Sequence, residues 1–308
     1  MKQKLVSIAM ATYNGEKYLR MQLDSILSQT YKNIEIIICD DCSTDGTVKI
    51  LEEYRKEHGI TYYVNERNLG YIKNFEKVLG YCSGEYIALS DQDDIWLNNK
   101  IEFLLNNIGD SPLIFSDACL IDHFGEIIAE SFYGYQNIIT RKYPDQFKYL
   151  LFSNFVTGCT SLFKKEIIAK AIPFIDSIPH DWWISLIASS IGNIVEVKLP
   201  LVLYRRHSNN AIGAKESKGI KISVKNRKIK ILKEIHIPSE IIKALKSRCD
   251  EFSKFHNILE IENDLDIYSK SILKKTPLHI NAFFIAWKYR KYWNNKYPEF
   301  FALTKLIV

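Results

Sequence analysis

The apolar run Ile34–Cys39 limits the fold most strongly, because it is rich in β-branched residues, as strands buried on both faces of a parallel sheet are. Similar short apolar runs occur at Val6–Met10 and Tyr86–Leu89, and stretches with apolar residues at helical spacing separate them. Strands that alternate with helices predict a largely parallel sheet with right-handed crossovers. We therefore expect an α/β fold with a mostly parallel, Rossmann-like central sheet flanked by helices.

Polar turns follow the predicted strands, at residues 11–15, 40–46, 65–70 and 91–94. Ligands of such sheets bind outside the carboxyl ends of the strands. We expect these four turns to face one shared crevice.

The turn Asp91-Gln92-Asp93-Asp94 ends one of the apolar runs and gathers three carboxylates. Clustered negative charge is repulsive unless a cation neutralises it, and Mg²⁺ or Mn²⁺ takes oxygen ligands together with substrate phosphates. The motif therefore predicts a divalent metal and a phosphorylated ligand. A solvated acidic turn is the alternative for a motif this short.

Composition places the chain among globular proteins: it has 308 residues, of which 47% are hydrophobic and 25% charged. No apolar run approaches the roughly 20 residues of a membrane-spanning helix, and Met1–Lys4 leads into a strand rather than a signal-peptide core. Six scattered cysteines do not form a disulfide framework, and the single Cys39-x-x-Cys42 pair has no second pair to complete a zinc site. We expect a cytoplasmic protein with reduced thiols.

Charge divides the chain into two predicted domains, residues 1–213 and residues 214–308. The second holds 20 Lys and Arg against 10 Asp and Glu, whereas the first is acidic. Apolar residues at helical spacing predict that the second is a mainly helical extension. Its basic character suits an anionic surface such as nucleic acid or the inner leaflet of a membrane, or a solvated helical face. The acidic first domain would repel a phosphate backbone, so we expect no nucleic-acid partner.

Three segments occur in one order along the chain: Val6–Gly15, Cys39–Thr47 and Asp91–Trp96. Together they resemble the family 2 glycosyltransferases of the GT-A fold, and the similarity continues to about residue 213. The resemblance implies an enzyme that binds a nucleoside-diphosphate sugar.

The resemblance also implies nucleotide contacts. The ring of Tyr13 would stack on a pyrimidine, and Asp40 would accept a hydrogen bond from its N3–H. Arg67 and Asn68 would contact the nucleotide, although both also suit a solvated turn. Backbone groups would come from Ala11 and Thr12.

For the metal, the resemblance implies Mn²⁺ or Mg²⁺ bound directly by Asp93, with Asp91 near the ribose or the ion. His207 matches a late histidine that many GT-A enzymes add to the metal shell, in keeping with imidazole as a common metal donor.

Asp181 falls where the family places its catalytic carboxylate. In an inverting transfer this base removes the proton of the acceptor hydroxyl, while a metal carries charge on the departing nucleoside diphosphate. The family usually has an acidic residue directly before this position, and here it is His180. Gly158 would let the backbone approach donor or acceptor closely.

The Gln-x-x-Arg-Trp signature of processive synthases is missing, which favours addition of a single sugar. Tyr204–Gly213 and Gly158–Thr160 are similar to bacterial rhamnosyltransferases of surface-polysaccharide assembly, whose donor is dTDP-L-rhamnose. This implies a glycan or polyprenyl-diphosphate-linked acceptor. We expect the basic extension to dock at the inner face of the plasma membrane, through residues that include Lys288, Arg290 and Lys291.

Two other classes of protein are alternatives to this enzyme. A non-catalytic nucleotide-sugar-binding or scaffolding member of the same fold would keep the crevice without turnover. A nicotinamide dehydrogenase fits poorly, because only Gly15 of the required G-x-G-x-x-G turn follows the first strand.

Overall fold

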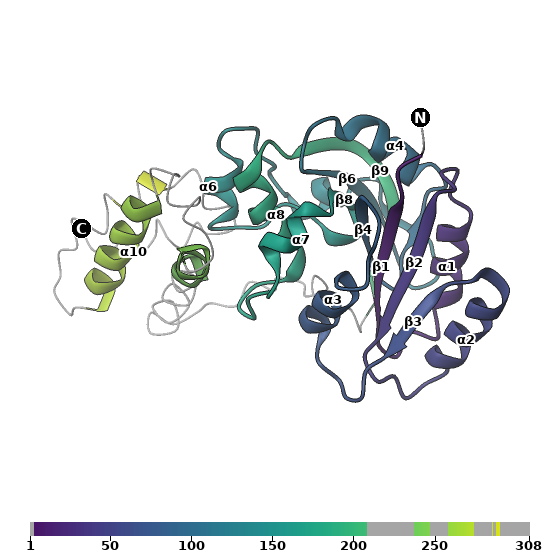
Figure 1. Cartoon of the computed structure of the whole chain (residues 1–308). Helices are drawn as coiled ribbons and strands as arrows, with labels where there is room; N and C mark the ends of the chain where they lie inside the picture. The colour runs from purple at the N-terminus through teal and green to yellow at the C-terminus, as the bar shows by residue number, and fades with distance from the viewer. Residues whose placement is uncertain (1–2, 208–236, 247–257, 274–284, 286–287, 290–308) are drawn as a thin grey trace. The chain divides into compact units, whose positions relative to one another are not determined.

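The structure is a computed structural model, and it describes residues 3–207, 237–246, 258–273, 285 and 288–289 (Figure 1). Backbone contacts divide the chain into two units: residues 1–144 with 155–215, and residues 145–154 with 216–308. The second unit therefore includes a segment that lies well before the basic extension in the sequence.

The first unit is built on a nine-stranded sheet with the order β3-β2-β1-β4-β8-β6-β9-β5, and β7 pairs with β6. The strands of the first half are β1 (Val6–Thr12), β2 (Ile34–Asp40), β3 (Thr61–Val64) and β4 (Tyr86–Ser90). Those of the second half are β5 (Ile95–Trp96), β6 (Leu113–Ile121), β7 (Ile127–Ala129), β8 (Ser161–Lys164) and β9 (Val195–Arg205).

The half made by β3, β2, β1 and β4 is entirely parallel, as predicted. Beyond β4 the sheet is mixed, because β8 inserts antiparallel between β4 and β6, and only β6 and β9 are parallel there. Every residue of β4 and β6 is buried, which accounts for their almost continuous apolar sequences.

Helices cover both faces of the sheet. In Figure 1, α1 (Leu19–Leu27) and α2 (Thr47–His58) lie on one face and α3 (Tyr71–Leu79) on the other, as right-handed crossovers require. The first unit also contains α4 (Lys100–Ile108), α5 (Phe132–Gln136), the short 3₁₀ turn η1 (Gly158–Thr160), α7 (Glu166–Ala171) and α8 (His180–Ile191).

The order of the strands fixes where a ligand binds. The chain moves from β1 to β2 and β3 on one side, then returns to place β4 on the other side of β1. Such a reversal opens a crevice between the loops that follow the two central strands. Here those loops begin at Tyr13 and Asp91.

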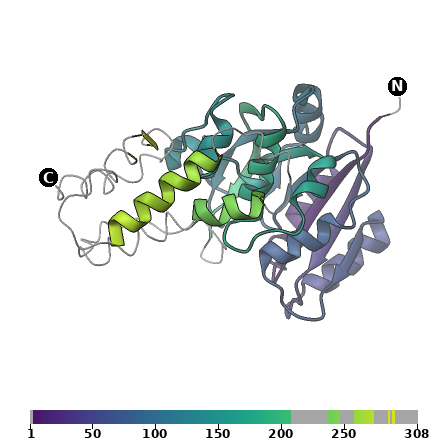
Figure 2. The ribbon, with the colours of Figure 1, turned by 60° about the vertical axis from the view of Figure 1, so that its left-hand side comes forward.

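The described part of the second unit is helical: α6 (Gln146–Leu150), residues 237–246 and α10 (Ile258–Leu273), which Figure 2 shows as a long yellow-green helix. Within this unit, Lys288 Nζ donates to Glu260 Oε1 at 2.6 Å and to Asp264 Oδ2 at 2.5 Å. Arg290 and Lys291 lie outside the described residues. Among the residues that the structure describes, no helix is both long and apolar enough to cross a bilayer.

Candidate active site at the carboxyl ends of the strands

Asp93 and His207 lie side by side, although 114 positions separate them in the chain. Asp93 Oδ2 is 2.7 Å from His207 Nε2, and each side chain is only 14% exposed. The end of β9 is bonded to the acidic turn: the Arg205 N–H donates to Asp94 Oδ1 at 3.0 Å, and Arg205 Nε donates to the Asp93 carbonyl at 2.9 Å. These bonds bring the histidine to the aspartate.

The other two carboxylates of the turn, of which Asp94 is fully buried, lie near Cys159. Oxygens of Asp91 and Asp94 and the sulfur of Cys159 all fall within 4.8 Å of one another. Burial, reinforced by neighbouring carboxylates, raises the pKa of Asp91 well above its ordinary value and raises the pKa of Asp94 to about 7.

Lys100 is a fully buried lysine beside this acidic turn, and the sequence analysis missed it. Its Nζ donates to the Cys159 carbonyl at 2.6 Å and lies 3.1 Å from the centre of the Trp96 ring. Burial lowers the pKa of Lys100 to about 7, whereas the negative charges of Asp94 and Asp91 raise it. Lys100 therefore connects the acidic turn with the 3₁₀ turn that carries Gly158.

Asp181 is the second residue of α8, and backbone groups hold its carboxylate in place. Gly158 N–H donates to Oδ2 at 3.0 Å, and Trp182 N–H donates to Oδ1 at 2.6 Å. Burial raises the pKa of Asp181 to about 6, although these backbone donors lower it. The carboxylate is therefore mostly ionised near neutral pH and remains basic enough to take a proton.

Close packing leaves little room for a side chain at Gly158. A Cβ atom there would lie 3.2 Å from Asp181 Cβ and 3.4 Å from His180 Nε2. Such a contact would push the 3₁₀ turn away from the carboxylate that it holds.

His180 occupies the place of the family's usual acidic residue. Its ring stacks on Phe75 with centroids 3.8 Å apart and meets Tyr71 edge-on at 6.0 Å. Burial lowers the pKa of His180 to about 3, so the ring is neutral at physiological pH. Asp181 accordingly has no charged residue directly before it.

Tyr13 is 46% exposed, and Gln92 holds its backbone from the acidic turn. Tyr13 N–H donates to Gln92 Oε1 at 2.8 Å, and Gln92 Nε2 donates to the Tyr13 carbonyl at 2.9 Å. Gln92 is a second residue that the sequence analysis missed, although its position between the two aspartates could have suggested it.

Asp40 is fully buried at the end of β2. Its carboxylate accepts bonds from Thr12 Oγ1 at 2.8 Å, from Ser43 N–H at 2.8 Å and from Ser43 Oγ at 2.6 Å. These bonds order the turn. Oδ2 accepts only one of them and keeps an acceptor position for the predicted bond to a pyrimidine, although the side chain is fully buried.

The remaining predicted nucleotide contacts lie on two loops. Thr12 is buried, and its carbonyl accepts the Asp41 N–H at 2.8 Å, while Ala11 is partly exposed. Arg67 and Asn68 are exposed before α3, where Asn68 Oδ1 accepts the Gly70 N–H at 3.0 Å.

A cavity of about 630 Å³ adjoins the acidic turn, which is within the usual range for small-molecule sites. It brings together Tyr13, Asp93 and His207 from the prediction. Lys17 and His123 join it from loops that the prediction did not include. The complete lining is Tyr13, Asn14, Gly15, Lys17, Tyr18, Gln92, Asp93, His123 and His207.

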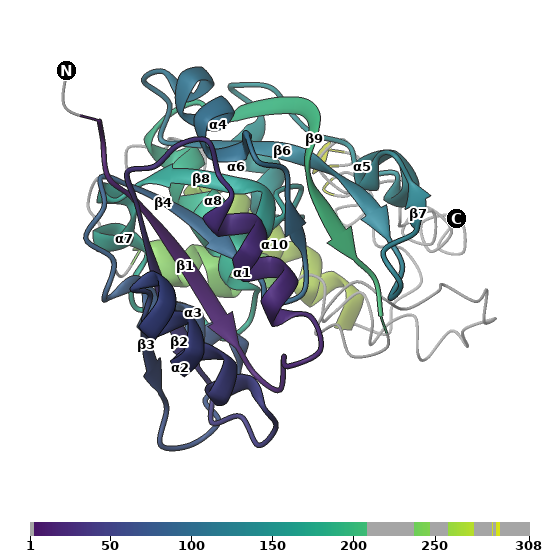
Figure 3. The same cartoon turned by 90° about the vertical axis from the view of Figure 1, so that its right-hand side faces the viewer.

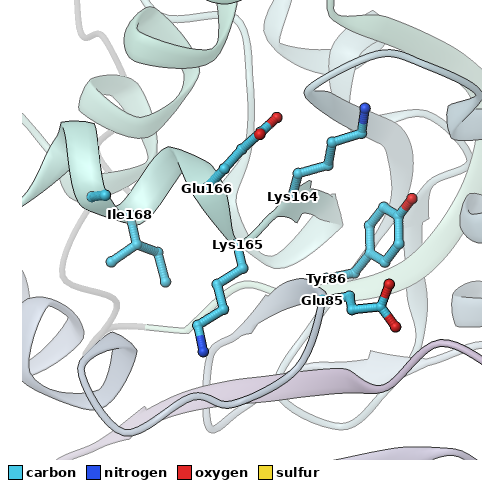
Figure 4. A pocket seen from close by; sticks show the side chains of 7 residues that line it. Glu85, Tyr86, Lys164, Lys165, Glu166 and Ile168 are labelled. Carbon is cyan, nitrogen blue, oxygen red and sulfur yellow. The ribbon is translucent and has the colours of Figure 1, made fainter.

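A second cavity of about 650 Å³ lies at the opposite, amino end of β4, around Tyr86 (Figure 4). The amino groups at its rim are bonded to the protein: Lys164 Nζ donates to the Asp110 carbonyl at 2.7 Å, and Lys165 Nζ donates to the Ser83 carbonyl at 3.3 Å. None of the predicted site residues lines it.

Comparison with known proteins agrees with this arrangement. The family model described as Glycosyl transferase family 2 matches residues 7–171. The chain is 31% identical to the dTDP-rhamnosyl transferase RfbG of Shigella flexneri, across 79% of this chain and 85% of that protein. It is 30% identical to the UDP-Glc:alpha-D-GlcNAc-diphosphoundecaprenol beta-1,3-glucosyltransferase WfgD of Escherichia coli, across 70% of this chain and 83% of that protein.

Solved structures share the fold at low sequence identity. TarS of S. aureus, in complex with UDP-GlcNAc, aligns with a TM-score of 0.56 at 15% identity, covering 87% of this chain and 80% of that one. The mannosyltransferase PcManGT of Pyrobaculum calidifontis, in complex with GDP-Man and Mn²⁺, aligns with a TM-score of 0.50 at 16% identity, covering 99% and 84%. The sheet, the site and the matched family model together show that this chain is a glycosyltransferase of family 2 with the GT-A fold.

Proposed function

We propose that this glycosyltransferase moves a single sugar, with inversion, from a nucleoside-diphosphate sugar to a hydroxyl of a glycan or lipid-linked glycan in bacterial surface-polysaccharide synthesis. The observation that carries the proposal is the carboxylate of Asp181, which is held by two backbone N–H groups and has its pKa raised to about 6 by burial. A base with these properties can accept the acceptor's proton at neutral pH.

The residues at the acidic turn fit a divalent cation. Asp93 Oδ2 and His207 Nε2 are 2.7 Å apart, close to the roughly 3 Å that separates adjacent ligands of an octahedral ion with bonds of about 2.1 Å. Carboxylate oxygens suit both Mg²⁺ and Mn²⁺, and the imidazole favours a transition metal such as Mn²⁺ over Mg²⁺. Asp93 and His207 would hold the ion, with Asp91 nearby, and the ion would supply charge neutralisation for the departing diphosphate.

The chain's own residues perform the remaining steps of the proposed reaction. The exposed Tyr13 ring gives a stacking surface for the donor's base, and Gln92 fixes its backbone against the acidic turn. Asp181 takes the acceptor's proton as the acceptor oxygen attacks the anomeric carbon from the side opposite the diphosphate.

The choice of donor and acceptor rests on the two relatives. The name of RfbG specifies a dTDP-rhamnosyl transferase, which supports dTDP-L-rhamnose as donor. The name of WfgD specifies a sugar on diphosphoundecaprenol, which supports a polyprenyl-diphosphate-linked acceptor. An enzyme with that acceptor would work in the cytoplasm at the inner face of the membrane.

The test is release of nucleoside diphosphate from a panel of dTDP-rhamnose, UDP-glucose, UDP-GlcNAc and GDP-mannose with Mn²⁺ or Mg²⁺. We expect Asp181→Asn to lose about 10²- to 10⁴-fold in rate while still binding donor in a thermal-shift assay. Asp117→Asn is the matched control, because Asp117 is also buried and accepts bonds from the N–H groups of Ala118 and Tyr133.

Three outcomes separate the alternatives. Equal rates for the wild type and Asp181→Asn would remove Asp181 from its role as base. Donor binding without turnover in the wild type would favour the non-catalytic member of the fold. A product with the donor's anomeric configuration, determined by NMR, would exclude inversion.

A further inference from the structure

The tip of the β6–β7 hairpin, defined here as residues 122–128, exposes large apolar side chains. Phe124 is 80% exposed, Ile127 65% and Ile128 41%. Hairpin turns are ordinarily built from small and polar residues. Apolar side chains grouped at one exposed point usually mark an interaction site.

Backbone hydrogen bonds hold this tip in a defined shape. Asp122 Oδ1 accepts the N–H of Phe124 at 2.8 Å and that of Glu126 at 2.9 Å, and the Asp122 N–H donates to the Glu126 carbonyl at 2.9 Å. Gly125 completes the turn at φ +97°, a conformation that favours glycine. Phe124 is thus presented to solvent by an ordered turn.

The hairpin is bonded to the candidate active site. Arg205 Nη1 donates to the Asp122 carbonyl at 3.1 Å, and the same arginine contacts the Asp93 carbonyl through Nε. His123 lines the cavity beside Asp93, and its ring lies 3.8 Å from that of Phe124. Figure 3 shows β6, β7 and the end of β9 together at one side of the sheet.

Cationic groups lie at the base of the tip. Arg206 N–H donates to the Ile121 carbonyl at 2.8 Å, which places this arginine where the hairpin begins. Lys17 lies over the Tyr18 ring, and the hydroxyl of that tyrosine donates to the His123 carbonyl at 3.5 Å. The tip also carries carboxylates: Asp122 accepts backbone N–H groups, whereas Glu126 and the nearby Glu130 are exposed. The apolar side chains are therefore the main contribution to binding at a bilayer interface, with Arg206 and Lys17 placed to meet negative headgroups.

We propose that the tip of the β6–β7 hairpin inserts into the interface of an anionic phospholipid bilayer and so holds the active-site cavity against the membrane. The step from membrane binding to catalysis rests on the proposed lipid-linked acceptor. Membrane binding by the tip does not depend on that acceptor. The proposal assigns membrane contact to the catalytic unit as well as to the basic extension.

The test is co-sedimentation of the full-length chain with vesicles of phosphatidylcholine and phosphatidylglycerol at a ratio of about three to one. Burying an aromatic side chain in an apolar phase contributes enough free energy for about a tenfold change in partition, so we expect at least that loss for Phe124→Ser and more for Phe124→Ser with Ile127→Ser. The matched control is Ile191→Ser at the end of α8 in the same unit, because Ile191 is 41% exposed, the same as Ile128, and lies near the opposite end of β6 from the hairpin. We expect this control to bind as the wild type does.

Activity assays distinguish the two proposals. Phe124→Ser should turn over donor with a water-soluble acceptor at the wild-type rate, and should lose rate only with a polyprenyl-linked acceptor in vesicles. Absence of turnover with any donor would contradict the proposed function and leave the sedimentation result valid. Equal vesicle binding by wild type and Phe124→Ser would overturn the inference. So would self-association of the wild type that Phe124→Ser abolishes, because the tip would then be a contact between two copies of the chain.

Discussion

The backbone N–H of Gly158 donates a hydrogen bond to Asp181 Oδ2 at 3.0 Å, across 23 positions of sequence. A 3₁₀ turn at the start of β8 therefore fixes the orientation of a carboxylate at the start of α8. Lys100 holds the next residue of that turn through the Cys159 carbonyl. The position of the proposed base thus depends on a glycine and on a buried lysine.

Gly158→Ala should reduce turnover by about 10- to 100-fold with little change in the donor's KM. The added Cβ would lie 3.2 Å from Asp181 Cβ, and small displacements of a catalytic group cause losses of this order. Gly192→Ala is the matched control, because its Cβ would lie equally close, 3.2 Å, to Pro112 Cδ and away from the carboxylates. A similar loss of rate in both variants would show a general effect of packing.

The rate should fall below about pH 6 as Asp181 becomes protonated, because burial raises the pKa of this base to about 6. The same shift makes the folded protein less stable above that pH. Ionising the buried carboxylate costs free energy in the folded state, whereas the carboxylate of the unfolded chain ionises at its ordinary pKa without that cost. The stability contributed by the protonated group is therefore complete below about pH 4 and is lost as pH rises through 6.

Thermal unfolding measured from pH 4 to pH 8 tests the predicted direction of this change in stability. The free energy of unfolding of Asp181→Asn, relative to that of the wild type, should increase as pH rises, by at most about 3 kcal/mol. A difference between the two proteins that is independent of pH would contradict the raised pKa.

His207→Ala should weaken Mn²⁺ binding at least tenfold in the presence of nucleoside diphosphate, because the imidazole lies 2.7 Å from the carboxylate of Asp93. Electron paramagnetic resonance of free Mn²⁺ measures this without turnover. His123→Ala is the control, since His123 lines the same cavity from the hairpin. Unchanged affinity in His207→Ala would remove this histidine from the metal shell.

Lys100→Met should lower the free energy of unfolding by about 3 kcal/mol, because it removes a buried amino group that interacts electrostatically with Asp94 and Asp91 and donates to the Cys159 carbonyl. Urea denaturation measures the change. Lys164→Met removes a comparable lysine bond to a backbone carbonyl at the surface, that of Asp110, and should cost less than about 1 kcal/mol. Equal losses in the two variants would show that the burial of Lys100 contributes nothing to the free energy of unfolding.

Local sequence patterns predicted the parallel half of the sheet and part of the crevice beside it, because turns 11–15 and 91–94 line the cavity, whereas turns 40–46 and 65–70 do not. The apolar runs at Val6, Ile34 and Tyr86 became β1, β2 and β4, and the strand order places the turns after them together. The antiparallel insertion of β8 between β4 and β6 could not be predicted in this way, because it depends on pairing between distant segments.

Residues that reach the site only through tertiary contacts could not be predicted from the sequence either. Lys100 stands in a polar stretch of sequence, and nothing in its spacing shows that it is buried beside the acidic turn. His123 enters the cavity only because the hairpin bonds to Arg205. By contrast, the resemblance to GT-A enzymes already implied that Asp93 and His207 lie together, and the structure places them 2.7 Å apart.

Main-chain donors, rather than side chains, orient the carboxylate of Asp181. Gly158 and Trp182 hold it through N–H groups that every amino acid except proline possesses, so substitutions of neighbouring side chains leave these two bonds available. Side chains around the pocket can therefore change without removing the two bonds that orient the proposed base.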